Sequence, residues 1–152
     1  MAQAVRHLQK FWRLSPSDRR LLVTAVFLLT AIRLGLWLLP VQTLRRVLAR
    51  GIQTPTRLDN SNQSFLKRTG WAVTVASRYV PRATCLTQAL AVQVLLERRG
   101  YRAHLCIGVA RGAPRRLEGH AWVEHQGQIV IGGGFLPDIL LPAFEEDGPH
   151  GG

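Results

Sequence analysis

Cysteine is scarce in this sequence: only Cys85 and Cys106 occur among 152 residues. They are 21 positions apart and the five histidines are scattered, so the close paired spacings that structural zinc requires are missing. A disulfide between them is disfavoured, because the sequence shows no secretory cleavage site and disulfides persist in oxidising compartments. We therefore expect a cytoplasmic protein without a metal site.

Acidic residues are also few, with 9 Asp and Glu against 20 Lys and Arg and a net charge of +11. Such a balance attracts nucleic acid, anionic lipid or acidic peptide. The basic residues are dispersed singly and in pairs, however, with no aromatic platform and no groove-reading motif among them. Nucleic acid is therefore not the expected partner.

No internal repeat is visible, and a chain of this length most often forms one domain. Composition divides it into an apolar helical segment (1–50), a polar linker (51–64), a core (65–144) and a polar, Gly-rich tail (145–152) that we expect to be disordered. Neither of the two larger segments is able to bury a full core alone, so we predict one integrated domain.

The run from Ser15 to Asp18 predicts a helix start, with Ser15 as N-cap and Pro16 at the first helical position. Residues 21–40 are then almost all apolar and nearly long enough to cross a bilayer, which needs about 20 such residues. Arg33 lies inside this stretch, where a charge costs about 2.5 to 3.5 kcal/mol, and both flanks are basic. A transmembrane helix, a peripheral membrane contact and a helix packed on the chain or on a partner all remain open.

Pro40 is expected to end this helix. The next ten residues, Val41 to Arg50, predict a short amphipathic helix with Arg45, Arg46 and Arg50 facing outward.

A second helix start is predicted at Thr84, an acceptable N-cap, which places Cys85 in the first helical turn. The unpaired N–H groups and the helix dipole there favour a thiolate over a thiol, and Arg82 adds a cation close by. The helix body is apolar on most of its circumference, which is typical of a helix buried at the centre of a domain. We expect it to run to about Arg99, with Gly100 as the left-handed residue that follows.

Short β-like runs follow, from Ala103 to Ala110, Gly119 to His125 and Gln128 to Ile131. Residues 111–116 predict an exposed loop, and Gln126-Gly127 predicts a tight hairpin turn. Three antiparallel strands packed on the cysteine helix make an α+β fold.

Cys85 and His120, 35 residues apart, together indicate a thiolate with an imidazole base. His120 has small neighbours, and Trp122 lies close enough in sequence to exclude water from its ring. Cys106 lies in the middle of a predicted strand and is interpreted as a small core residue. The pattern predicts covalent acyl transfer by a cysteine nucleophile.

The sequence resembles the lasso-peptide biosynthesis B protein, in its stand-alone protease form, which is a transglutaminase-like cysteine peptidase. The runs that carry the resemblance are Trp71 to Val73, Val80 to Ala91, Leu96 to Tyr101, Ile107 to Val109 and His120 to Glu124. They occur in order, and the resemblance covers most of residues 10–135.

This resemblance implies a transglutaminase/papain-like core, with Cys85 as nucleophile and His120 as general base, and no cofactor. It implies removal of the leader peptide from a ribosomally made precursor, just before the core peptide. The partners it implies are the precursor peptide, a leader-binding recognition-element protein and an ATP-dependent lasso cyclase. It also favours an apolar N-terminal helix that packs on the peptidase domain or binds partner proteins.

Transglutaminase-like sites usually orient the imidazole with an acid about a dozen residues further on, where this sequence has Ile131 to Gly134. A turn at 126–127 is expected to pair Ala121 with Gly132 and His120 with Gly133, so that no carboxylate faces the ring.

Three hypotheses remain for the third catalytic group, the one that orients the His120 ring. It is Asp138, a backbone carbonyl that orients a Cys-His dyad, or an acid brought in by other geometry. Glu124 is too far along the strand from His120, at about 3.3 Å per residue. Gln88 or the backbone N–H of Cys85 are candidate oxyanion donors, although Gln88 fits a helix-surface position equally well.

Two other functions also remain open. One is a catalytically silent scaffold, in which Cys85 is structural and the N-terminal helix holds a partner. The other is a transglutaminase or amidase, which shares Cys85 and His120 and differs in the group that resolves the thioester.

Overall fold

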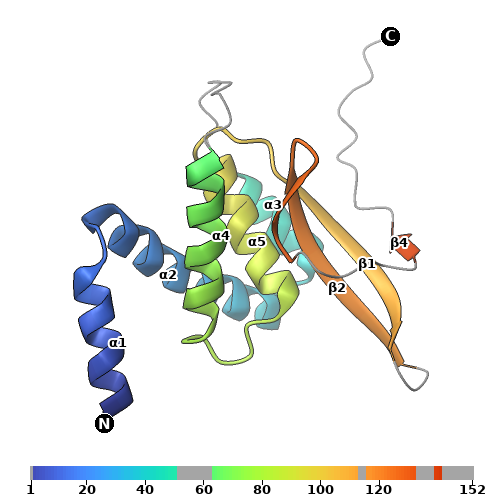
Figure 1. The fold of residues 1–152 in the computed structure, drawn as a ribbon. Helices are drawn as coiled ribbons and strands as arrows, with labels where there is room; N and C mark the ends of the chain where they lie inside the picture. The colour runs from blue at the N-terminus through green and yellow to red at the C-terminus, as the bar shows by residue number, and fades with distance from the viewer. Residues whose placement is uncertain (1, 51–62, 113–115, 133–138, 142–152) are drawn as a thin grey trace.

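The computed structural model describes residues 2–50, 63–112, 116–132 and 139–141. Within these ranges, helices are followed by a small antiparallel sheet (Figure 1). The helices are α1 (Ala2–Arg13), α2 (Pro16–Leu38), α3 (Val41–Arg50), α4 (Gln63–Ser77) and α5 (Cys85–Glu97). The strands are β1 (His104–Gly112), β2 (Arg116–His125), β3 (Gln128–Ile131) and β4 (Ile139–Leu141). The arrangement is the α+β class that the sequence predicts.

Helix α2 begins as expected. Ser15 is the N-cap, Pro16 follows it, and the backbone N–H of Asp18 donates to Ser15 Oγ at 3.2 Å. The Asp18 carboxylate accepts from Ser15 Oγ at 2.7 Å and from Nε of Arg68 at 2.7 Å. This ion pair joins the start of α2 to α4.

One face of α2 packs on α4 and α5 through buried Leu22, Ala25, Leu29 and Ile32. The apolar stretch thus contributes to the core of the chain. By length and composition, α2 is also the one helix of the described ranges that meets the requirement for crossing a membrane.

Helix α3 has the predicted bounds and lies against α2 through Leu44, which is buried beside Gly35. Arg46 and Arg50 are exposed, as expected. Arg45 is half-buried, so it is less exposed than predicted.

Helix α4 was not predicted from the sequence, because the first turn of this helix is polar like the linker before it. It begins at Gln63, so the linker expected over 51–64 ends sooner than predicted, and residues 51–62 and 145–152 lie outside the described ranges. Its inner face includes Leu66, Gly70 and Val73, which are buried.

Helix α5 is buried on most sides, because α2, α4 and the sheet enclose it (Figure 1). This enclosure explains why apolar residues occur around nearly its whole circumference. The helix ends at Glu97, two residues before the predicted end, and Gly100 follows with a φ of 86°. The backbone N–H of Tyr101 donates to Leu96 and that of Gly100 to Glu97, which is a Schellman motif.

The sheet has the order β3-β2-β1-β4, and all its pairs are antiparallel. Strands β1 and β2 extend further into the predicted loop of residues 111–116 than expected, and β4 adds an edge that was not predicted. Gly108 on β1 is opposite His120 on β2. Gln126 and Gly127 have positive φ values of 49° and 76°, as a two-residue hairpin turn requires.

The register predicted between β2 and β3 is confirmed next to the turn and is wrong by one residue beyond Glu124. Glu124 is opposite Ile129, but Val123 is opposite Ile131, which leaves Val130 as the extra residue of a β-bulge. A Cβ added at Gly70 would lie 2.5 Å from the Val130 carbonyl oxygen, so this bulge sits directly against α4. The pairing predicted between Ala121 and Gly132 is therefore displaced, and the one predicted between His120 and Gly133 lies outside the described residues.

We predict that Gly70→Ala destabilises the fold by about 1–3 kcal/mol, because the new methyl group meets a backbone oxygen that is unable to swing away. Helix propensity alone would stabilise this variant by about 1 kcal/mol, so the sign of the effect tests the contact. Urea unfolding measures the change.

Gly35→Ala is the matched control, since it is also a helical glycine but its added Cβ meets the flexible end of Leu44. We expect its unfolding free energy to change by less than about 1 kcal/mol. A Gly70→Ala protein as stable as the wild type would contradict the close packing of α4 on β3.

Candidate active site

A tight turn leads into α5. The backbone N–H of Ala83 donates to the carbonyl of Val80 at 3.3 Å, and Pro81 and Arg82 lie between them. Pro81 suits the second position of such a turn, while Arg82 adopts a φ of 58°, which is uncommon for a residue with a side chain. The strained residue lies three positions before Cys85.

The predicted cap of α5 is confirmed. Thr84 is extended, its side chain accepts from the backbone N–H of Thr87, and its carbonyl accepts from the N–H of Gln88. The two threonine hydroxyls lie 3.1 Å apart. Cys85 is therefore the first residue of the helix, at the end where the dipole favours negative charge.

The thiol of Cys85 points to the residue before His120. Its Sγ lies 3.9 Å from the carbonyl oxygen of Gly119, and the side chain is half-buried. Consecutive Cα atoms are 3.8 Å apart, so this contact brings α5 and the His120 position of β2 together. The structure thus places Cys85 beside the strand position that the sequence pairs with it.

His120 is held by a backbone carbonyl. Its Nε2 lies 2.9 Å from the carbonyl oxygen of Gly132, the residue that follows β3. A carbonyl only accepts hydrogen bonds, so this contact assigns the proton of the neutral ring to Nε2 and makes Nδ1 the basic nitrogen.

Only glycine fits at position 132. Its φ is +85°, and an added Cβ would lie 2.8 Å from both the Ala121 carbonyl oxygen and Cβ of Trp122. An aspartate at this position would therefore clash with β2. Of the three hypotheses for the group that orients His120, the structure shows a contact with a backbone carbonyl. Asp138 lies outside the described ranges.

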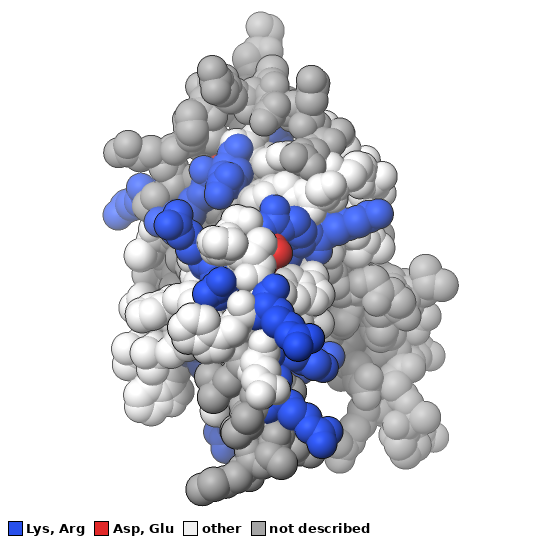
Figure 2. All heavy atoms as spheres, turned by 60° about the vertical axis from the view of Figure 1, so that its left-hand side comes forward, with Lys and Arg blue, Asp and Glu red and all other residues white. Residues whose placement is uncertain are grey.

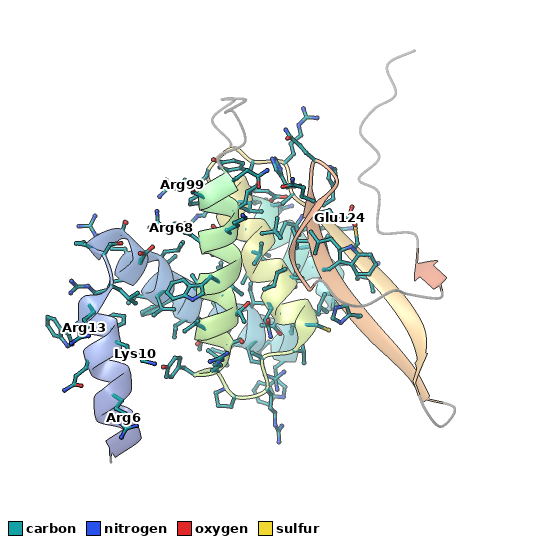
Figure 3. All side chains as sticks on the ribbon, in the orientation of Figure 1. Arg6, Lys10, Arg13, Arg68, Arg99 and Glu124 are labelled. Atoms are coloured by element: carbon teal, nitrogen blue, oxygen red, sulfur yellow. The ribbon has the colours of Figure 1, made fainter. Side chains whose placement is uncertain are left out.

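Trp122 covers one side of the imidazole. It is buried, and its ring is nearly parallel to that of His120, with centroids 6.4 Å apart. Its Nε1–H donates to the Glu124 carboxylate at 2.7 Å, and Figure 3 shows Glu124 on the same sheet. Glu124 therefore orients the indole, in keeping with its predicted distance from His120.

Gln88 lies one turn after Cys85 on α5 and is half-buried. This position is compatible both with an oxyanion donor and with a helix-surface residue, so its role stays a prediction.

The sequence did not identify Gly119 and Gly132 individually, because each contributes a main-chain oxygen. The glycine run directly after β3 was the available signal.

Cys106 is different in character from Cys85. It lies in β1 opposite Trp122, and both cysteines are thiols rather than partners in a disulfide. Burial, together with the negative charge of Glu124, raises the pKa of the Cys106 thiol above its ordinary value of 9.0. These features agree with a structural residue.

Comparison with protein families finds that residues 26–138 match the Transglutaminase-like superfamily. The matched region is well over half of the chain and contains α3, α4, α5 and the strands of the site. Comparison with curated proteins and with solved structures finds no match. This superfamily usually comprises cysteine peptidases and transglutaminases.

We predict that Gly132→Ala slows alkylation of Cys85 by iodoacetamide at neutral pH about tenfold or more, because a displaced carbonyl no longer fixes the imidazole tautomer. The pH profile of the alkylation rate should change with it.

Gly127→Ala is the control for this variant. Gly127 also has a positive φ, of 76°, but an added Cβ meets nothing within 4 Å. It should lose about 1 kcal/mol of stability and keep the wild-type alkylation rate. Equal rates in both variants would remove Gly132 from the site.

We also predict that iodoacetamide at neutral pH modifies Cys85 before Cys106, because the raised pKa of Cys106 lowers its thiolate fraction. Peptide mass spectrometry of timed samples measures both rates. His120→Ala should slow modification of Cys85 and leave that of Cys106 unchanged; faster labelling of Cys106 would contradict the assignment.

Proposed function

We propose that this chain, which belongs to the transglutaminase-like superfamily, is a cysteine peptidase that removes the leader from a ribosomally made lasso-peptide precursor. The observation that carries the catalytic part is the convergence of Cys85, at the start of α5, on the Gly119-His120 segment of β2. A nucleophile on a rigid helix and a base on a rigid strand are the parts that acyl transfer needs.

The choice of a leader peptidase is supported by the sequence runs that resemble the lasso-peptide B protein. The runs from Val80 to Ala91 and from His120 to Glu124 lie on the two elements that meet at the site. Trp71 to Val73 lies on α4, which packs against α5 and β3. The resembling runs therefore belong to one packed unit.

The proposed reaction begins with proton transfer from the Cys85 thiol to Nδ1 of His120. The thiolate attacks the carbonyl carbon at the leader-core junction and forms a tetrahedral intermediate. The intermediate collapses as the C–N bond breaks, and His120 returns the proton to the departing amine of the core. Water, deprotonated by His120, then attacks the thioester, which releases the leader carboxylate and restores the thiol.

Charge on the intermediate needs hydrogen-bond donors. The N–H of Cys85 is among the first N–H groups of α5, which have no partner within the helix. Together with the Gln88 amide, it is the proposed oxyanion donor. The group that orients His120 during turnover is the Gly132 carbonyl, and Trp122 limits access of water to the ring.

The proposed partners are the precursor peptide, a leader-binding recognition-element protein and an ATP-dependent lasso cyclase that uses the freed core amine. A ribosomally made precursor places the reaction in the cytoplasm. No cofactor takes part in the proposed step.

A catalytically silent scaffold is the second candidate. The observation that favours it is the neutral Gly132 carbonyl at His120, because a carbonyl stabilises an imidazolium less than a carboxylate does. A transglutaminase or amidase would use the same two residues and is distinguished by its acyl acceptor.

We predict that the wild-type protein, mixed with the candidate precursor and the leader-binding partner, yields separate leader and core fragments by intact mass spectrometry. Cys85→Ala and His120→Ala should yield none, because each removes an essential step. Cys106→Ala is the matched control and should cleave at the wild-type rate, since it removes the other thiol of the chain and leaves Cys85 and His120 in place.

Uncleaved precursor in every sample, with the partner shown to bind it, would contradict the peptidase and favour the scaffold. Asp138→Asn extends the test: near wild-type cleavage agrees with orientation by the carbonyl, whereas a loss of orders of magnitude would assign the third position to Asp138.

A further inference from the structure

Helix α2 carries an exposed apolar face opposite its buried one. The apolar stripe, as we name it, consists of Val23, Phe27, Leu34 and Leu38, which are 46%, 74%, 54% and 69% exposed. Their spacings of four, seven and four residues keep them within one face of a helix. The stripe therefore extends over about four helical turns without a covering element in the described ranges.

Apart from Arg33, which is half-buried, the residues between these positions carry no charge. Thr30 and Ala31 lie on the same face and are exposed. The Thr30 hydroxyl donates a hydrogen bond to the Val26 carbonyl of its own helix. Exposed contiguous apolar surface of this kind marks a contact with a membrane or a protein.

Basic residues lie at both ends of the stripe. Arg20 is exposed on the same face of α2, one turn before Val23, and Arg46 and Arg50 are exposed on α3, which follows Leu38. Helix α1 adds Arg6, Lys10 and Arg13 (Figure 3).

The charge asymmetry extends through the first 50 residues, which hold nine Lys and Arg and one acidic residue, Asp18. That carboxylate is already paired with Arg68. Figure 2 shows the side of the molecule on which α1 lies: blue basic groups are spread over it and red is confined to one small spot. The potential on this side is therefore positive.

Two exposed tryptophans accompany the basic residues. Trp37, at the C-terminal end of the stripe, is 80% exposed, and Trp12, on α1, is 70% exposed. The Arg19 guanidinium lies over the Trp12 ring, 5.5 Å from its centroid. Tryptophan and arginine are the side chains that suit the headgroup level of a bilayer, where apolar and charged surroundings meet.

The opposite face of α2 restricts how the helix meets lipid. Leu29 and Ile32 are fully buried against the core, and Arg33 is half-buried beside them. A spanning orientation would expose this packed face and place the charge in hydrocarbon. A helix lying in the plane of the interface keeps the core intact and offers only the apolar stripe to lipid.

We propose that the apolar stripe of α2 docks in the plane of an anionic bilayer surface, with the basic residues of α1, α2 and α3 on the headgroups. Charge complementarity selects lipid over other occupants, because basic residues frame the stripe at both ends. The interaction is separate from the peptidase step and leaves Cys85 and His120 on other elements.

The test is flotation of the full chain with vesicles of phosphatidylcholine alone and of phosphatidylcholine mixed with phosphatidylglycerol. We expect binding to the anionic vesicles only, weakened by salt. The double variant Phe27→Glu with Leu34→Glu should lower the bound fraction at least about tenfold, because both side chains lose their place in the acyl region. Arg20→Glu with Arg46→Glu should lower it too and reduce its dependence on salt.

Ile129→Glu is the matched control, since Ile129 is 51% exposed but lies on β3. It should bind like the wild type, and circular dichroism of each variant verifies folding. Alkaline carbonate should strip the protein from the vesicles; resistance would indicate a spanning helix and overturn the proposal. Unchanged vesicle binding of the Phe27→Glu, Leu34→Glu variant would also overturn the proposal. If the protein binds no vesicles and instead forms a dimer that Phe27→Glu dissociates, the apolar stripe is a contact with a second copy of the chain.

Discussion

Enclosure of α5 is the constraint on which the rest of this structure depends. With α2, α4 and the sheet packed around it, the helix is held on nearly every side. Cys85 is the first residue of this helix, so its backbone is held in place as well. The same packing brings the N-terminal start of α5 to β2, so that the Cys85 thiol contacts the Gly119 carbonyl next to His120. The proposed catalytic pair of Cys85 and His120 therefore needs no loop to position it.

The second constraint is the close approach of α4 to β3. Gly70 allows the bulged Val130 carbonyl to come against the helix, and the bulge places Ile131 opposite Val123. Gly132 then presents its carbonyl to His120 with a backbone conformation that suits glycine. In this chain a main-chain oxygen stands where the superfamily usually places an acidic side chain, which preserves orientation of the ring while giving less charge stabilisation.

Local chemistry made much of this predictable. Thr84, Ser15 and Gly100 determine helix ends through their own side chains or backbone freedom, and all three were identified from the sequence. The bulge at Val130 was not predicted, because it depends on a contact with a helix 60 residues earlier. A carbonyl partner for His120 was one of three open hypotheses, since side-chain patterns do not reveal which way a main-chain oxygen points.

The Gly132 carbonyl holds His120 with the proton on Nε2, which leaves Nδ1 as the basic nitrogen that is proposed to serve Cys85. This assignment of the proton is the premise of the proposed proton transfer. Nitrogen-15 NMR of the histidine side chains, with His120 assigned through the His120→Ala variant, tests it directly. We predict that the Nε2-protonated tautomer dominates when the ring is neutral and that Gly132→Ala removes this preference. A neutral His120 ring protonated on Nδ1, or a tautomer unaffected by Gly132→Ala, would contradict it.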